Sequence, residues 1–188
     1  KLETAFTMDT SRIKFGKGVT KEIGSDFKIM GVKRLMICTD NRVAKLSTME
    51  VVEASLKEVG LEYEIFSGVS VEPADVSFLE AIDFAKKGKF DGYLGVGGGS
   101  SMDTVKAANL YATYPPEDFL DYVNPPIGKG KPVPGPIKPM ICIPTTAGTG
   151  SETTGVAIFD LLSMEAKTGI AHRSLRPLMG IIDPDNTR

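Results

Sequence analysis

Two short segments rich in glycine and hydroxyl side chains carry residue types that bind anions. They are residues 97–100 and 144–152, and each directly follows an apolar run. Glycine lets backbone N–H groups approach a phosphate, hydroxyls add further donors, and the N-terminus of a following helix favours negative charge. Two such segments in one chain predict a diphosphate ligand, such as a dinucleotide.

Taken alone, the first segment is a weak signal. Its run Gly97-Gly98-Gly99-Ser100 departs from the dinucleotide fingerprint, because Ser100 replaces the last glycine and the turn comes late in the chain. Its context strengthens the signal, since the spacing of Ser100 and Asp103 predicts a capping box that opens a helix. A tight strand-to-helix turn without a ligand is the alternative.

The second segment is too dense in hydroxyl groups to read as core. These hydroxyls belong to Thr145, Thr146, Thr149, Ser151, Thr153 and Thr154. They are suited to lining a nucleotide. A cluster of local side-chain-to-backbone turns is the alternative explanation.

Asp40 stands just after the apolar run 35–38. An acid at the end of such a strand commonly accepts hydrogen bonds from ribose hydroxyls and repels a 2′-phosphate, which favours NAD over NADP. The pair Asp40-Asn41 is also good turn chemistry, so an Asx turn or a helix cap is an equal alternative.

Residues for a reacting centre are scarce. His172 is the only histidine, whereas a metal site built on imidazole needs two or more such ligands. The sequence also lacks a CxxC pair, which could supply thiolate ligands instead. The two cysteines, Cys38 and Cys142, fall inside apolar runs and are predicted to be buried. The sequence therefore predicts a cofactor site, with neither a catalytic residue nor a metal ligand in this chain.

Apolar periodicity predicts the elements that must position these residues. Continuous apolar runs that suit buried strands are residues 35–38, 63–66, 93–96 and 140–143. Segments with helical periodicity are residues 19–27, 52–59, 78–85 and 102–112. This alternation predicts an α/β fold, a Rossmann-like parallel sheet with flanking helices and ligands at the carboxyl ends of its strands.

The alternation stops at residue 114. Most of the 12 prolines lie between residues 115 and 139, which predicts a long irregular loop. Further along, residues 156–159, 167–172 and 179–182 predict short strands, suited to hairpins, instead of further strand-helix units.

The overall composition limits the partners. A chain of 188 residues predicts a single dinucleotide-binding domain over residues 1–188. A net charge of −2 gives no field that would recruit nucleic acid or an anionic membrane surface. No stretch approaches the roughly 18 apolar residues of a membrane span. The expected partners are small molecules.

Residues 97–108 and 144–154 resemble the two nucleotide-loop signatures of the iron-containing (group III) alcohol dehydrogenases, and the resemblance covers essentially the whole chain. More narrowly, several segments resemble the mitochondrial hydroxyacid-oxoacid transhydrogenase branch of that family: residues 71–75, 106–111, 118–123, 126–132 and 153–160. The resemblance implies the N-terminal domain of a two-domain enzyme. A following helical domain, expected beyond Arg188, would supply an aspartate and three histidines to iron or zinc, and His172 matches none of these.

The resemblance also implies roles for single residues. Gly98, Gly99 and Ser100 would hold the pyrophosphate, with Asp103 beside it. The remaining implied contacts are the nucleotide for Thr145, Thr146 and Thr149, the ribose or nicotinamide side for Thr154 and Lys167, and the adenosine ribose for Asp40. One departure is the run from Glu72 to Asp75, where many members have Pro-Asn-Pro-Thr; a site that keeps its nicotinamide would explain it.

The implied activity is hydride transfer from 4-hydroxybutyrate to 2-oxoglutarate, with NAD and a divalent metal as cofactors. The 1–188 chain alone is expected to be inactive, and the full-length protein is expected to be a homo-oligomer. Two alternatives remain: an iron-type alcohol dehydrogenase that uses free NAD, and a non-catalytic nucleotide-binding module. The resemblance implies a mitochondrial location; otherwise the cytoplasm is expected.

Overall fold

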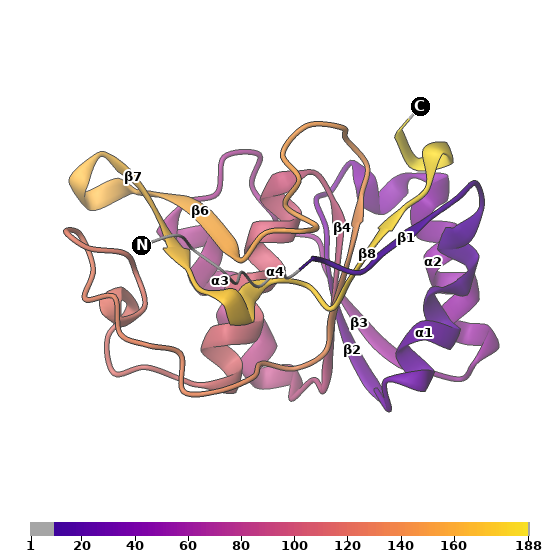
Figure 1. The fold of residues 1–188 in the computed structure, drawn as a ribbon, viewed down its shortest axis with the longest axis horizontal. Coiled ribbons are helices and arrows are strands. Elements are labelled where there is room, and N and C mark those ends of the chain that lie inside the picture. The colour runs from indigo at the N-terminus through magenta and orange to yellow at the C-terminus, as the bar shows by residue number, and fades with distance from the viewer. Residues whose placement is uncertain (1–9, 188) are drawn as a thin grey trace, which may run out of the picture.

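A six-stranded parallel sheet forms the centre of the structure, a computed structural model that describes residues 10–187 (Figure 1). Its strands, in spatial order, are β1 (Ile13–Phe15), β8 (Met179–Ile182), β5 (Met140–Pro144), β4 (Gly92–Gly97), β2 (Arg34–Cys38) and β3 (Glu62–Phe66). The α-helices are α1 (Ile23–Ile29), α2 (Ser47–Glu58), α3 (Asp75–Gly88) and α4 (Gly99–Thr113). The predicted Rossmann-like α/β fold is confirmed.

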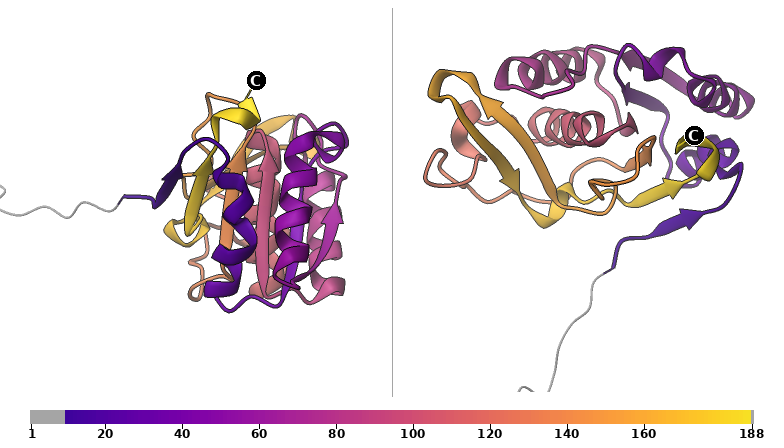
Figure 2. Two further views of the ribbon diagram at one scale, coloured as in Figure 1. Left: turned by 90° about the vertical axis from the view of Figure 1, so that its right-hand side faces the viewer. Right: turned by 90° about the horizontal axis from the view of Figure 1, so that it is seen from above.

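Helices cover both faces of the sheet, and alternate residues of its strands point to opposite faces. Leu35 and Ile37 of β2 pack in the cluster that contains the apolar faces of α1 and α2, whereas Met36 and Cys38 pack with α3 and α4. Figure 2 shows α1 and α2 lying across one face of the sheet. No helix within residues 10–187 has the length and apolar character needed to cross a bilayer.

An antiparallel hairpin lies outside the helix layer formed by α3 and α4. It consists of β6 (Val156–Leu161) and β7 (Ala166–Ala171), and its buried side chains, Phe159 among them, pack with α3 and α4 (Figure 1). The hairpin confirms the prediction of short strands after residue 155. Residues 179–182 differ from a hairpin arrangement, since as β8 they pair in parallel with both β5 and β1 of the main sheet.

The proline-rich stretch between α4 and β5 is irregular, as predicted, apart from a 3-10 turn at Phe119–Asp121. It is nevertheless well anchored. Asp121 is 2% exposed and pairs with Lys129 at 2.8 Å and Lys131 at 3.0 Å. The side-chain hydrogen bond from Lys129 and that from Lys131 lower the pKa of Asp121 to about 2, so this anchor stays charged at neutral pH.

Candidate functional site

The candidate site lies at the carboxyl edge of three neighbouring strands, β2, β4 and β5. Asp40 follows β2, Gly98 follows β4 and Thr145 follows β5. The chain runs from β2 outward to β3 and then returns to β4 on the other side of β2, so the strand order reverses between β2 and β4. In open α/β sheets such a reversal leaves a crevice where ligands bind.

The two glycine- and hydroxyl-rich segments lie side by side at this edge. A Cβ at Gly98 would lie 3.4 Å from Thr146 Oγ1, and a Cβ at Gly99 would lie 3.0 Å from Thr149 Cγ2. The N–H of Thr145 donates to the carbonyl oxygen of Gly97 at 2.9 Å, which extends the pairing of β4 and β5 into the loops. The segments therefore form one shared crevice.

The ten residues to which the resemblance assigns a cofactor contact all line one of two adjoining depressions at this crevice. Thr153 lines neither, because its hydroxyl donates to the carbonyl oxygen of Gly150 at 2.9 Å, which is the local turn considered as an alternative. The first, here called the Asp40 hollow, is lined by Asp40, Gly98, Ser100, Thr145 and Thr146 among others. The second, here called the Lys167 cleft, has a volume of about 430 Å³ and is lined by Gly99, Ser100, Asp103, Thr149, Thr154 and Lys167 among others. Ser100 and Val71 border both depressions.

The helix that follows the first loop begins differently from the prediction. The N-cap of α4 is Gly98, without a side-chain cap, so the expected capping box of Ser100 and Asp103 is wrong. Tertiary partners compete for both side chains: Ser100 Oγ donates to the carbonyl oxygen of Val71 at 2.6 Å, and Asp103 Oδ2 accepts from the N–H of Ile158 at 3.1 Å. The first N–H groups of a helix have no acceptor within it, so those of Gly99 and Ser100 remain available to an anion at the crevice.

Asp40 divides its two carboxylate oxygens between two tasks. Oδ1 accepts from the N–H groups of Arg42 at 2.7 Å and Val43 at 2.9 Å, which is the Asx turn considered as an alternative. Oδ2 lies 3.8 Å from where a Cβ at Gly97 would be, on the side of the glycine loop. The turn therefore fixes the carboxylate and leaves one oxygen beside the Asp40 hollow.

A buried ion pair of Asp103 and Lys106 lies behind the Lys167 cleft. The sequence analysis did not predict this pair. Lys106 is fully buried, and its Nζ lies 3.6 Å from Asp103 Oδ1, 3.2 Å from Thr154 Oγ1 and 2.8 Å from the carbonyl oxygen of Val156. Burial lowers the pKa of Lys106 and raises the pKa of Asp103, while their mutual attraction opposes both shifts. The available signal was a lysine within an otherwise apolar stretch of the helix, three residues after an aspartate.

The loop before α3 forms another wall of the Lys167 cleft, beside the two glycine- and hydroxyl-rich segments. Val71, Glu72 and Pro73 line the cleft. Ser100 holds this loop at Val71, and the N–H of Asp160 donates to the carbonyl oxygen of Pro73 at 2.8 Å. The departure from the family pattern at Glu72 thus lies on the cleft itself.

Lys167 stands on β7 of the hairpin and also lines the cleft. Its Nζ lies 3.4 Å from Asp160 Oδ1 across the two strands of the hairpin, and its side chain is 67% exposed. The lysine is therefore held at the cleft by a carboxylate while most of it remains accessible.

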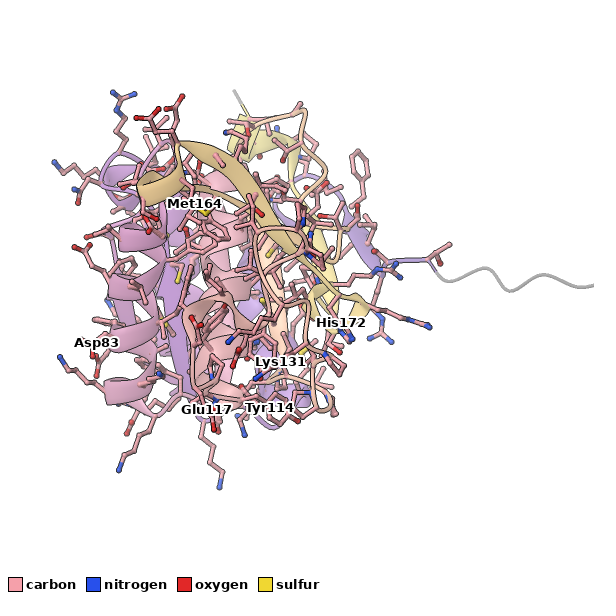
Figure 3. All side chains as sticks on the ribbon, turned by 90° about the vertical axis from the view of Figure 1, so that its left-hand side faces the viewer. Asp83, Tyr114, Glu117, Lys131, Met164 and His172 are labelled. Carbon is pink, nitrogen blue, oxygen red and sulfur yellow. The ribbon has the colours of Figure 1, made fainter. Side chains whose placement is uncertain are left out.

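The residues considered for other chemistry lie apart from the crevice. His172 lies at one end of the hairpin, away from Met164 in the turn at the other end (Figure 3). Its Nδ1 accepts from the N–H of Ser174 at 3.1 Å. Cys38 and Cys142 are buried and unbridged, and burial raises the pKa of Cys142 to about 12, so it is not a thiolate at neutral pH. Residues 10–187 contain no group of three or more histidine, cysteine, aspartate or glutamate side chains placed to hold a metal ion.

Comparisons of sequence place the chain among known proteins. The sequence profile of the family described as iron-containing alcohol dehydrogenase matches residues 10–184. The mitochondrial hydroxyacid-oxoacid transhydrogenase of Mus musculus is 55% identical over 183 residues, and the probable enzyme of that name in Dictyostelium discoideum is 52% identical over 194. The match covers 97% of this chain in both cases, but 39% of the mouse protein and 36% of the Dictyostelium protein.

Comparisons with solved structures also find dehydrogenases and reductases. The NADH-dependent butanol dehydrogenase A of Thermotoga maritima superposes with a TM-score of 0.87 at 29% identity, over 97% of this chain and 45% of that one. The sulfoacetaldehyde reductase of Bifidobacterium kashiwanohense, solved in complex with NAD+, gives a TM-score of 0.85 at 26% identity, over 98% of this chain and 48% of that one. This chain thus spans less than half the length of these relatives.

Proposed function

The chain belongs to the iron-containing alcohol dehydrogenase family, and we propose that its domain binds NAD with the diphosphate between the two loops. The observation that carries this proposal is the contact of the two loops, with Gly98 against Thr146 and Gly99 against Thr149. Backbone N–H groups at the start of α4 and threonine hydroxyls of the second loop then face one anion from two sides.

The two depressions suit the two halves of a dinucleotide. In this proposal the Asp40 hollow receives the adenosine ribose, where Asp40 Oδ2 accepts a ribose hydroxyl. The Lys167 cleft receives the nicotinamide half, bordered by Thr154 and Lys167. Because the Ser100 hydroxyl already donates to Val71, we expect Ser100 to meet the pyrophosphate through its backbone N–H.

The family and the named relatives are oxidoreductases, and we propose the same class for the protein of which this domain is part. The proposed reaction moves a hydride from C4 of 4-hydroxybutyrate to C2 of 2-oxoglutarate, while the C4 hydroxyl loses a proton and the C2 oxygen gains one, which gives succinate semialdehyde and D-2-hydroxyglutarate. The nicotinamide supplies the hydride acceptor and donor. The residues of this chain bind and orient it at the Lys167 cleft.

The family's metal does not fit the residues described, because residues 10–187 contain no suitable ligand cluster. We therefore propose that the metal is held by the part of the relatives that this chain does not match, and that 1–188 alone binds the nucleotide without catalysing hydride transfer. Turnover by purified 1–188 would contradict this. A mitochondrial location and homo-oligomerisation belong to the same proposal, the former supported by the names of the relatives.

The first test of the proposal is the affinity of the chain for NAD and NADP, measured by isothermal titration calorimetry on wild type and Asp40→Asn. Asparagine keeps the Oδ1 acceptor of the turn but removes the acceptor beside the hollow and the charge that repels a 2′-phosphate. We expect NAD binding to weaken roughly 10- to 100-fold, since a charge-assisted hydrogen bond contributes about 1.5–3 kcal/mol, and NADP binding to strengthen.

Asp91→Asn is the matched control. Asp91 Oδ1 also accepts from two backbone N–H groups, of Lys33 at 3.0 Å and Arg34 at 2.8 Å, but at the opposite edge of the sheet. Its substitution should leave the ratio of NAD to NADP affinity unchanged. A wild-type chain that binds neither NAD nor ADP would rule out the proposed function.

A further inference from the structure

We infer that Asp103 and Lys106 act together as positioning residues that fix the nicotinamide wall of the site, an inference that rests on the proposed function. The wall is the start of the hairpin, where Thr154, Val156 and Ile158 line the Lys167 cleft. Both members of the pair are on α4, one helical turn apart, and both reach this wall.

The pair supplies hydrogen-bond partners to the outer edge of β6, the edge that does not face β7. One edge of β6 pairs with β7, and the backbone groups along its other edge require partners from elsewhere. Lys106 donates to the carbonyl oxygen of Val156 at 2.8 Å, and Asp103 accepts from the N–H of Ile158 at 3.1 Å. Side chains of α4 thus occupy the positions that a neighbouring strand would take.

The same lysine also reaches the second loop. Its Nζ lies 3.2 Å from Oγ1 of Thr154, which is two residues before the start of β6. Asp103 is 8% exposed and Lys106 is fully buried, so water does not replace these contacts readily. A charge buried this deeply is retained only when it is paired and hydrogen-bonded, as both are here.

Asp103 and Lys106 contact the residues of only one of the two depressions. The wall at 154–158 borders the Lys167 cleft, whereas the Asp40 hollow is bordered by Asp40, Thr145 and Thr146. Asp103 and Lys106 make no contact with those three residues among the hydrogen bonds and ion pairs of the described chain. Loss of the pair should therefore loosen one half of the site and spare the other.

The test compares NAD with ADP, which presents only the adenosine and diphosphate groups, by titration calorimetry. In Lys106→Met we expect NAD affinity to fall about tenfold and ADP affinity to stay within about twofold of wild type. A general structural role would weaken both ligands together. Equal losses for NAD and ADP, or an unchanged NAD affinity, would overturn the inference.

Lys106→Met leaves the Asp103 carboxylate buried without its ion-pair partner, which threatens folding. The double variant Lys106→Met/Asp103→Asn removes both charges and keeps an acceptor for the N–H of Ile158. It should fold and still show the selective loss for NAD, because nothing replaces the donor to Val156 and Thr154. A double variant with the wild-type ratio of NAD to ADP affinity would overturn the inference, whereas a wild type that binds neither ligand would overturn the proposed function instead.

Discussion

Replacing Gly98 by valine is expected to weaken NAD binding about 100-fold while the domain stays folded. Gly98 is the N-cap of α4 at φ −80° and ψ −171°, an extended conformation that suits a β-branched residue. Its Cβ would lie near one other side chain of the protein, Thr146, with Oγ1 at 3.4 Å and Cγ2 at 4.0 Å. The larger side chain would instead occupy the space between the loops, where we expect the diphosphate to hydrogen-bond. Titration calorimetry with NAD measures the loss.

Leu46→Val is the control for this substitution. Leu46 is the N-cap of α2 with nearly the same backbone conformation, φ −87° and ψ 156°, and its side chain is exposed. A valine there should leave NAD affinity unchanged. If Gly98→Val binds NAD as wild type does, the diphosphate does not lie between the two loops, and the placement of the dinucleotide is wrong.

Much of the site could be predicted because parallel strands bring their carboxyl ends together. The continuous apolar runs identified β2, β4 and β5, and the residues that follow them, such as Asp40 and Gly98, necessarily meet at one edge. The fold class predicts that a ligand binds at this edge. Which side chain contacts which ligand atom stays a prediction, which the binding experiments address.

The remainder depended on contacts between residues far apart in the sequence. The spacing of Ser100 and Asp103 gave a local reason for a capping box, but Val71 and Ile158, which lie 29 and 55 residues away, took both side chains. Sequence periodicity contains no information about such partners. The burial of Lys106 could not be predicted for the same reason. Its hydrogen-bond acceptors, Thr154 and Val156, lie 48 and 50 residues further along the chain.

The return of the chain to the main sheet as β8 also depends on distant contacts. Asp183, directly after β8, is 2% exposed and accepts hydrogen bonds from the N–H groups of Gly18 at 3.0 Å, Thr20 at 3.1 Å and Asp185 at 3.1 Å. The Thr20 hydroxyl donates to it as well, at 2.8 Å. One carboxylate thus joins the end of β8 to the turn between β1 and α1.

Asp183→Ala is expected to lower the free energy of unfolding by about 3 kcal/mol, because the substitution leaves several donors unsatisfied at a cost of about 1–3 kcal/mol for each one that stays buried. Guanidinium denaturation followed by circular dichroism measures the loss. Asp83→Asn is the control, since its side chain is 61% exposed and its ion pair with Lys87 lies on the surface of α3. That change should stay within about 0.5 kcal/mol of wild type.

The loss should also depend on pH in a defined direction. Burial alone would raise the pKa of Asp183, but the hydrogen bonds from Gly18 and Thr20 more than offset it and hold the pKa below its usual value. A carboxylate whose pKa is lower in the folded chain stabilises it fully above its ordinary pKa of about 3.9, and this stabilisation is lost as the pH falls through the folded value. The difference between wild type and Asp183→Ala should therefore be largest near neutral pH and should narrow below about pH 4. A difference that stays constant from neutral pH down to about pH 3 would show that the carboxylate is not held in its charged form by these donors.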